Sequence, residues 1–195
     1  MNNLIKQKQI EILKIELKIK KLEIDILKDL EFEFFLQVEG YENYSISNHG
    51  NIKNNKTNRI MKPYNDKDGY KLIDLSKNGI RKKFKVHRLV GNAFLENHDK
   101  KPNVDHIDEN KSNNNVKNLR WATIQENKYN QGNRIDNSSG YKGVSLRKDR
   151  NKYQASIKIN GKLKNLGLFE TPEEASYAYE TKAKKIHGEF YYKNQ

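Results

Sequence analysis

Hydrophobic residues near the start of the chain recur at helical spacing. Residues 4–31 contain neither Gly nor Pro and are rich in Leu, Lys and Glu, which are strong helix formers. One heptad row, typical of a coiled coil, consists of Ile5, Ile12, Ile19 and Ile26. A second row consists of Ile10, Leu17 and Ile24. The stripe is therefore wider than a dimer seam needs, and two alternatives stay open: self-association through residues 4–31, or packing on the chain's own domain.

Turn residues and short alternating runs follow this helix. Residues 36–64 are punctuated by Gly40, by Asn48–Asn51 and by Asn54-Asn55, which predicts small β-hairpins. Alternating runs around Tyr70–Asp74 and Phe84–His87 flank the turn Lys77-Asn78-Gly79, a strong hairpin signal.

The middle of the chain predicts a helix, a strand and a second helix. Residues 87–97 place Leu89, Val90, Ala93 and Phe94 on one face of a short helix. Residues 104–107 predict a short strand, and an Asn-rich polar loop then runs to Asn118. Thr123 is a suitable N-cap for a helix that carries Glu126 and Asn127.

The last part of the chain predicts a sheet and one helix. After the linker-like residues 131–138, apolar residues alternate on both sides of the turn Asn160-Gly161. Thr171-Pro172 begins a helix, with acidic residues in its first turn, and Gly188 ends it. The residues expected on its buried face are Ala175, Ala178, Tyr179, Ala183 and Ile186.

Composition narrows the class of protein. Only 34% of the residues are hydrophobic and 32% are charged, so small modules are expected in place of one large core. The formal net charge of +13 favours a polyanionic partner; nucleic acid is the leading reading and an anionic membrane surface the competing one. The absence of cysteine excludes disulfides and Cys-based zinc sites. With no visible signal peptide and no bilayer-spanning run, we expect a soluble intracellular protein that is not secreted.

Four polar residues form a candidate catalytic constellation. Asp105 and His106 are neighbours on a predicted strand, so their side chains diverge, and one can hold a metal while the other faces a water. Asn118 and Asn127 follow at spacings of twelve and nine residues. A strand, a loop and a helix would bring them onto one small site.

The motifs around these residues resemble the HNH endonucleases of phage introns and large DNA viruses. The matching segments are Val86–Leu95, Val104–Asp108, Asn113–Asn115, Asn118–Thr123 and Glu126-Asn127. The resemblance implies a ββα-metal fold with one divalent ion, Mg²⁺ or another such as Mn²⁺. It also implies that His106 is the general base, that Asp105 and Asn127 bind the metal, and that Asn118 holds the loop. The neutral Asn127 oxygen suits a hard ion better than Zn²⁺.

Both flanks resemble DNA-binding modules. Residues 36–64, around Tyr41–Ile52, resemble the NUMOD4-like module that often precedes this nuclease; a supporting structural hairpin is the alternative. Residues 139–195 resemble an AP2 DNA-binding domain, whose sheet lies in the major groove. The positions that would contact DNA are Lys142, Arg147, Tyr153, Ser156, Lys158, Asn165 and, within the nuclease motif, Arg120.

These inferences together predict an α+β protein. Its expected parts are a long helix at residues 1–31, a NUMOD4-like module at 32–80, an HNH nuclease at 81–130, a linker at 131–138 and an AP2-like domain at 139–195. The expected function is sequence-directed cleavage of double-stranded DNA, as in homing-type nucleases. A DNA-binding transcriptional regulator with an inactive nuclease centre is the alternative, and an RNA-binding protein is a third reading.

Overall fold

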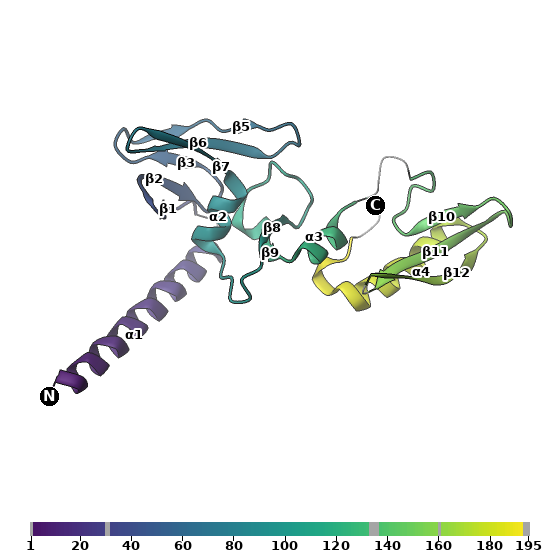
Figure 1. The fold of residues 1–195 in the computed structure, drawn as a ribbon, viewed down its shortest axis with the longest axis horizontal. Helices are drawn as coiled ribbons and strands as arrows, with labels where there is room; N and C mark the ends of the chain where they lie inside the picture. The colour runs from purple at the N-terminus through teal and green to yellow at the C-terminus, as the bar shows by residue number, and fades with distance from the viewer. Residues whose placement is uncertain (1, 30–31, 133–136, 160, 193–195) are drawn as a thin grey trace. The chain divides into compact units, whose positions relative to one another are not determined.

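The structure, a computed structural model, is α+β, which confirms the predicted class (Figure 1). It describes residues 2–29, 32–132, 137–159 and 161–192. The chain divides into two compact units. The first comprises Met1–His98 and Asn110–Arg120, and the second comprises Asp99–Glu109 and Trp121–Gln195.

The helix α1 (Asn2–Asp29) confirms the helix predicted over residues 4–31, of which 30 and 31 lie outside the described residues. Its apolar side chains are more than half exposed at Ile5, Ile10, Ile12, Leu13, Ile15, Leu17, Ile19, Leu22 and Ile26. The Lys21 ammonium lies 2.7 Å from the Glu96 carboxylate, so the C-terminal part of the helix contacts its own unit. Charged residues interrupt every apolar run, and no helix in the described part of the chain is long and apolar enough to cross a membrane.

Two antiparallel sheets follow α1. The first has the order β1-β2-β3-β4, formed by β1 (Phe35–Val38), β2 (Tyr41–Ser47), β3 (Ile52–Asn54) and β4 (Arg59–Met61). The second has the order β5-β6-β7, formed by β5 (Tyr64–Asn65), β6 (Lys71–Lys77) and β7 (Ile80–Lys85). Asn78 and Gly79 both have positive φ (51° and 79°), which confirms the two-residue hairpin turn. The core here includes the fully buried Ile46, Ile52 and Leu75.

The helix α2 (Val86–Phe94) is shorter than the predicted 87–97. It buries Leu89, Val90 and Phe94 as expected, but Leu95 is extended (φ −111°, ψ 128°). After Glu96, the three residues Asn97, His98 and Asp99 have low helix propensity, which disfavours extension of the helix once its apolar face has ended.

The short elements after α2 form the central region. The strand β8 (Asn103–His106) and the strand β9 (Leu119–Ala122) make a two-stranded sheet. The strand was predicted at 104–107; Ile107 is exposed and lies beyond it. The 3₁₀ turn η1 (Val116–Asn118) precedes β9, and α3 (Ile124–Asn130) follows it with Thr123 as the N-cap, as predicted.

The C-terminal part confirms the expected three-stranded antiparallel sheet with one helix. The sheet has the order β10-β11-β12, formed by β10 (Val144–Arg147), β11 (Lys152–Ile159) and β12 (Lys162–Phe169). The helix α4 (Pro172–His187) packs on it and leads into η2 (Gly188–Phe190). Residues 133–136 of the predicted linker and Asn160 of the predicted turn lie outside the described residues.

For one residue on the buried face of α4, Ile186, the prediction was wrong. Ala175, Tyr179 and Ala183 are buried, but Ile186 is 37% exposed, and His187 is buried in its place. The reason is that the Tyr129 ring stacks on His187, with ring centroids 3.6 Å apart. The buried face is therefore set by an aromatic partner on another helix, which apolar spacing does not reveal.

Candidate functional site

The strand β8 ends on the two residues of the predicted catalytic pair. Asp105 and His106 are both buried, with relative exposures of 6% and 5%. Successive strand residues point to opposite faces, so the carboxylate and the imidazole leave the backbone in different directions. A buried, ionisable pair at a strand end is the kind of arrangement that an active site uses.

The backbone of His106 is tied to α3. The Asn130 side-chain amide donates to the His106 carbonyl at 2.7 Å, and the Glu109 backbone N–H donates to the same oxygen at 3.0 Å. Asn130 is itself buried. Helical residues three apart share a face, so Asn127, one turn earlier, lies on the side of α3 that meets β8. The structure thus places Asp105, His106 and Asn127 in one unit, on two elements that are in contact.

The start of α3 is fixed by a reciprocal cap. The Thr123 hydroxyl accepts from the Glu126 backbone N–H, while the Glu126 carboxylate accepts from the Thr123 N–H at 2.6 Å. Lys101 pairs with Glu126 at 3.0 Å. Burial alone would raise the pKa of Glu126, but the hydrogen bonds from Thr123 and Lys101 outweigh it and lower the pKa. The helix that carries Asn127 therefore has a well-defined first turn.

Glu109 links the exits of β8 and α3. It follows β8 in a turn, with a positive φ of 63°, and its carboxylate accepts a hydrogen bond from the Gly132 backbone N–H. Burial raises the pKa of Glu109, Asp105 contributes in the same direction, and Lys142 opposes the rise. Glu109 was missed at the sequence level because nothing in its local pattern points to residue 132.

Asn118 lies in the other compact unit, in the Asn-rich loop. Its side-chain amide donates to the Asn113 carbonyl at 2.9 Å, which closes the loop on itself. The Val116 N–H donates to the Asn48 carbonyl at 2.8 Å. Gly50 has φ +87°, and a Cβ there would lie 2.7 Å from the Asn114 Cβ. The loop is therefore packed directly on the turn between β2 and β3.

The donor atoms of the candidate metal site are oxygens. In the described residues no group of three or more His, Cys, Asp and Glu side chains could hold a metal ion. The pair expected here is the Asp105 carboxylate and the neutral Asn127 amide, on the facing elements β8 and α3. Few, hard oxygen ligands fit a hydrated Mg²⁺ ion, which keeps several of its waters. The residues present fit such an ion.

The outer face of the C-terminal sheet gathers most of the predicted DNA-contacting residues. Ala155 and Ile157 are buried against α4, so the alternating Gln154, Ser156 and Lys158 face away from that helix. Asn165 pairs with Ser156 in the register and shares that face.

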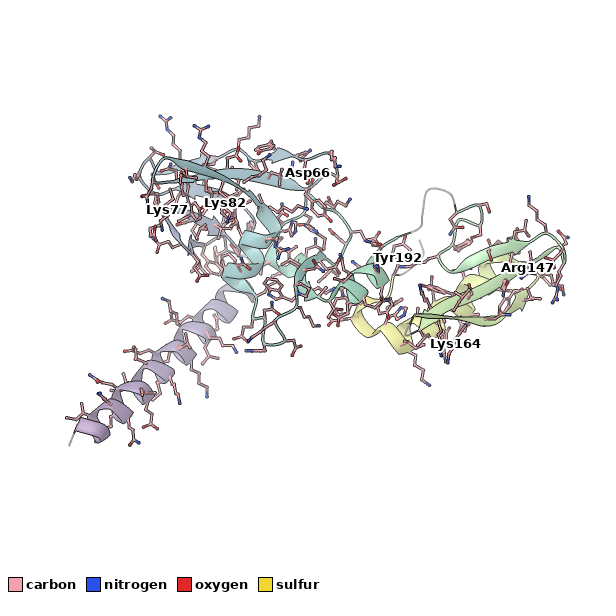
Figure 2. The ribbon with its side chains drawn as sticks, viewed as in Figure 1. Asp66, Lys77, Lys82, Arg147, Lys164 and Tyr192 are labelled. Carbon is pink, nitrogen blue, oxygen red and sulfur yellow. The ribbon has the colours of Figure 1, made fainter. Side chains whose placement is uncertain are left out.

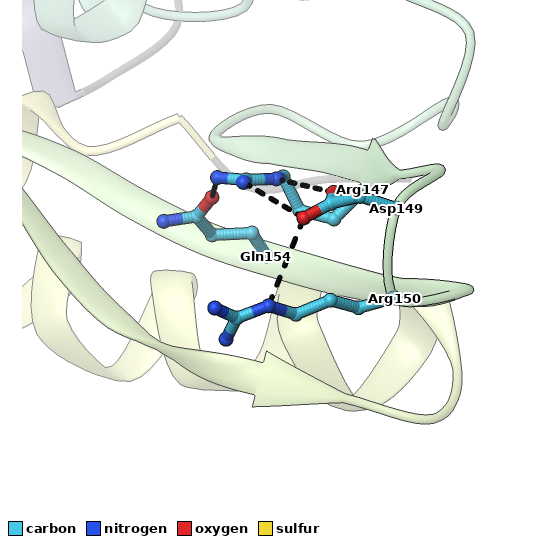
Figure 3. A network of polar contacts seen from close by, with 4 residues as sticks. All are labelled: Arg147, Asp149, Arg150 and Gln154. Atoms are coloured by element: carbon cyan, nitrogen blue, oxygen red, sulfur yellow. Dashed lines mark hydrogen bonds and ion pairs between the residues drawn. The ribbon is translucent and has the colours of Figure 1, made fainter.

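Arg147 lies on the same outer face, within a polar network (Figures 2 and 3). Its guanidinium donates to both carboxylate oxygens of Asp149 at 3.1 and 3.2 Å and to the Gln154 side-chain oxygen at 3.1 Å. Arg150 approaches Asp149 at 3.7 Å. These hydrogen bonds hold the pKa of Asp149 below its usual range and orient the Arg147 group.

The remaining predicted DNA-contacting residues lie elsewhere. Tyr153 packs against the core formed by Val144, Ala155 and Ala175. Arg120 is half-buried in β9. The Lys142 ammonium donates to backbone carbonyls at the end of α3, including that of Tyr129 at 2.7 Å.

A known protein family matches the part of the chain that contains Asp105, His106, Asn118 and Asn127. Residues 84–129 match the HNH endonuclease family, and residues 33–76 match the NUMOD4 motif. Residues 84–129 therefore carry the sequence pattern of the HNH endonucleases, a family of phosphodiester hydrolases.

Individual relatives cover different shares of the chain. It is 41% identical over 92 residues to the uncharacterized HNH endonuclease L245 of Acanthamoeba polyphaga mimivirus (47% of this chain, 28% of that protein). It is 44% identical over 98 residues to DNA endonuclease I-HmuI of Bacillus phage SP01 (50% and 56%). It is 34% identical over 87 residues to Protein 3.8 of Escherichia phage T7 (45% and 71%). The chain thus spans less than two thirds of the length of the first two.

A solved structure also resembles part of the chain. It describes DNA binding and cleavage by the HNH homing endonuclease I-HmuI, with a TM-score of 0.48 and 42% sequence identity. The similarity covers 50% of this chain and 57% of that one.

Proposed function

We propose that this chain is a metal-dependent, homing-type DNA endonuclease that hydrolyses phosphodiester bonds of double-stranded DNA. The observation that carries the proposal is the hydrogen bond from the Asn130 amide to the His106 carbonyl. It joins the strand with the Asp105-His106 pair to the helix with Asn127, and these three residues lie inside the segment that matches the HNH family.

The residues have separate roles in this proposal. His106 takes the proton from the attacking water as a general base. Asp105 and Asn127 hold one divalent ion, Mg²⁺ or Mn²⁺. When bound, that ion supplies a positive charge next to the reacting phosphate and the leaving oxygen. Asn118 keeps the Asn-rich loop in its closed form through the Asn113 carbonyl.

The proposed DNA-binding surface is the outer face of the C-terminal sheet, which we propose is an AP2-like domain. Arg147, Ser156, Lys158 and Asn165 form this face, and Arg120, within the segment that matches the HNH family, adds a further contact. An oriented Arg can bind two guanine acceptors, whereas Lys binds phosphate as a point charge. DNA binding by the related I-HmuI supports the choice of partner.

The exposed apolar stripe of α1 is proposed to join two copies of the chain. Its described Ile and Leu side chains are more than half exposed on both heptad rows. Two copies would supply two active sites. Sedimentation analysis should give a dimer or higher oligomer, and replacing Ile12 and Ile19 by Lys should give a monomer; a monomeric parent chain would refute the idea.

A nicking assay tests the proposed chemistry. Supercoiled plasmid and Mg²⁺ are incubated with the parent chain, with His106→Ala and with His106→Gln. Loss of the general base should slow nicking by about 10²–10⁴-fold. His98→Ala is the matched control, since the His98 side chain is 81% exposed, and it should nick at the parent rate.

Two outcomes would refute the nuclease. Equal nicking by the parent chain and both His106 variants would remove His106 from the chemistry. DNA binding by the parent chain without nicking in Mg²⁺ or Mn²⁺ would support the regulator reading. Thermal unfolding of the two His106 variants establishes that each is folded before the rates are compared.

A further inference from the structure

The Lys142 side chain ends at the C-terminus of α3. Its ammonium donates to the Tyr129 carbonyl at 2.7 Å, to the Lys128 carbonyl at 3.5 Å and to the Gln131 carbonyl. The last carbonyls of a helix have no partner within the helix, and they form the negative end of its dipole. A lysine placed there satisfies several of them together and adds a favourable charge interaction.

The surroundings of the Lys142 ammonium disfavour a direct contact with DNA. Burial lowers the pKa of Lys142 to about 8, an effect that the nearby Glu109 carboxylate partly opposes. The Tyr192 ring centroid lies 5.3 Å from the ammonium. A cation that is partly desolvated and bound to three carbonyls is poorly placed to reach a DNA phosphate.

The contacts of α3 continue from Lys142 to the candidate site. Asn130, between the carbonyls of Tyr129 and Gln131, donates its side-chain amide to the His106 carbonyl. Gly132, just after them, donates its N–H to Glu109 in the turn that leaves β8. A displacement of the end of α3 would therefore move Asn127 relative to Asp105 and His106.

Other residues of the C-terminal part pack on the same helix. The Tyr129 and His187 rings stack at 3.6 Å with an interplanar angle of 8°. Lys101, which pairs with Glu126 at the start of α3, has its ammonium 5.3 Å from the Phe190 ring. The helix α3 also packs against η2. Lys142 is thus one part of a broad interface between α3 and the C-terminal part.

We propose that Lys142 is a positioning residue for DNA cleavage: it clamps the C-terminus of α3 and so holds Asn127 opposite the Asp105-His106 strand. The C-terminal module then supports the geometry of the nuclease site as well as binding DNA. This inference rests on the proposed endonuclease function. It assigns Lys142 a role different from the DNA contact that the resemblance implies.

A positioning role for Lys142 and a direct DNA contact predict different kinetic effects: the first affects the maximal nicking rate and the second affects the affinity for DNA. Nicking of supercoiled plasmid in Mg²⁺ is followed with protein in excess over DNA, which separates the plateau rate from the half-saturating protein concentration. Lys142→Met should lower the plateau rate at least tenfold and change the half-saturating concentration less than twofold. Lys142→Arg, which can still donate to several carbonyls, should recover most of the rate.

Two further variants calibrate the experiment. Lys182→Met removes one exposed charge from α4 of the same module and should change neither quantity. Lys158→Met removes an exposed charge from the outer sheet face and should raise the half-saturating concentration with the plateau unchanged. If Lys142→Met behaves like either of these two variants, Lys142 is not a positioning residue.

Amide hydrogen exchange tests whether Lys142 holds the C-terminus of α3, and it does so independently of DNA cleavage. In Lys142→Met, the amides of residues 127–131 should exchange at least tenfold faster than in the parent chain, while the strands β10–β12 keep their protection. Lys142→Arg should be intermediate. Unchanged exchange over residues 127–131 overturns the clamp even if DNA is cut, whereas faster exchange in a protein that cuts no DNA upholds the clamp and refutes the nuclease.

Discussion

The loop of Asn118 and the helix of Asn127 are held in place by different means. The loop is fixed mainly by neutral hydrogen bonds and by close backbone packing against Gly50, and one lysine, Lys111, donates to the Asp68 carbonyl. The helix α3 is fixed at both ends by charged side chains, with Glu126 and Lys101 at its start and Lys142 at its end. Steric packing leaves little room for adjustment, whereas charged contacts respond to pH. Substitutions in the loop should therefore cost stability, and substitutions around α3 should alter the alignment of the site.

The largest effect is expected at Gly50. Gly50→Ala should lower the free energy of unfolding by about 2–4 kcal/mol, because a positive φ disfavours Ala and because the new Cβ overlaps Asn114. Gly40→Ala is the matched control: φ is +73° but no atom lies within 4 Å of the added Cβ, so about 1 kcal/mol is expected. Urea unfolding measures both, and an equal loss would show that the contact with Asn114 is unimportant.

The next largest loss of stability is expected from a substitution in the contact between α3 and β8. Asn130→Ala leaves the buried His106 carbonyl without the amide and should cost about 1–3 kcal/mol. The plateau rate of plasmid nicking should fall with it, since Asn127 shares the helix. Asn92→Ala, at an exposed position in α2, should be close to neutral in both measurements. If Asn130→Ala loses stability but nicks DNA at the parent rate, the contact between Asn130 and His106 is not needed to align the site.

Two equivalent helix caps provide an internal comparison. Thr123 and Thr171 each form a capping box, at the start of α3 and α4 respectively. Each Thr→Ala substitution should cost about 1 kcal/mol of stability. Only Thr123→Ala should also slow nicking at saturating protein, because α3 carries Asn127. Similar losses of rate in the two variants would mean that nicking follows overall stability and not the position of α3.

Local signals explain most of what could be predicted from the sequence. Caps, turns and periodicity each involve residues close together in the chain, so Thr123, Thr171 and the turn Asn78-Gly79 were placed correctly. The Asp105-His106 pair was placed on a strand for the same reason, and in the structure it lies at the end of that strand. Hydrophobic alternation also predicted the C-terminal sheet and its helix.

Contacts between elements were not predictable in this way. Lys142 reaches carbonyls that lie 11 to 14 residues before it, and the Asn130 amide reaches a carbonyl 24 residues before it. Neither contact leaves a periodic pattern in the sequence, because each depends on how one element packs on another. The buried His187 in place of Ile186 has the same origin, since its partner Tyr129 belongs to a different helix.

The smallest expected effect is the pH response of the interface with α3. Burial, helped by the positive charge of Lys142, lowers the pKa of His187 below its ordinary 6.5. In the described residues neither ring nitrogen has a hydrogen-bond partner. Below pH 6.5 the unfolded chain therefore binds the proton more readily than the folded one, and the stability contributed by neutral His187 is lost as the pH falls through this window.

His187→Phe should keep the ring stacked on Tyr129, but it has no group at this position that binds a proton when the chain unfolds. Urea unfolding of the parent chain and of His187→Phe at pH 7, 6 and 5 should show the parent losing more stability than the variant. Carboxylates that protonate in the same range affect both proteins alike, so the difference between them isolates the ring. Parallel losses would mean that His187 takes up its proton as easily in the folded chain as in the unfolded one. The contrast with the loop of Asn118, which is held mainly by neutral hydrogen bonds, would then rest on Lys142, Lys101 and Glu126 alone.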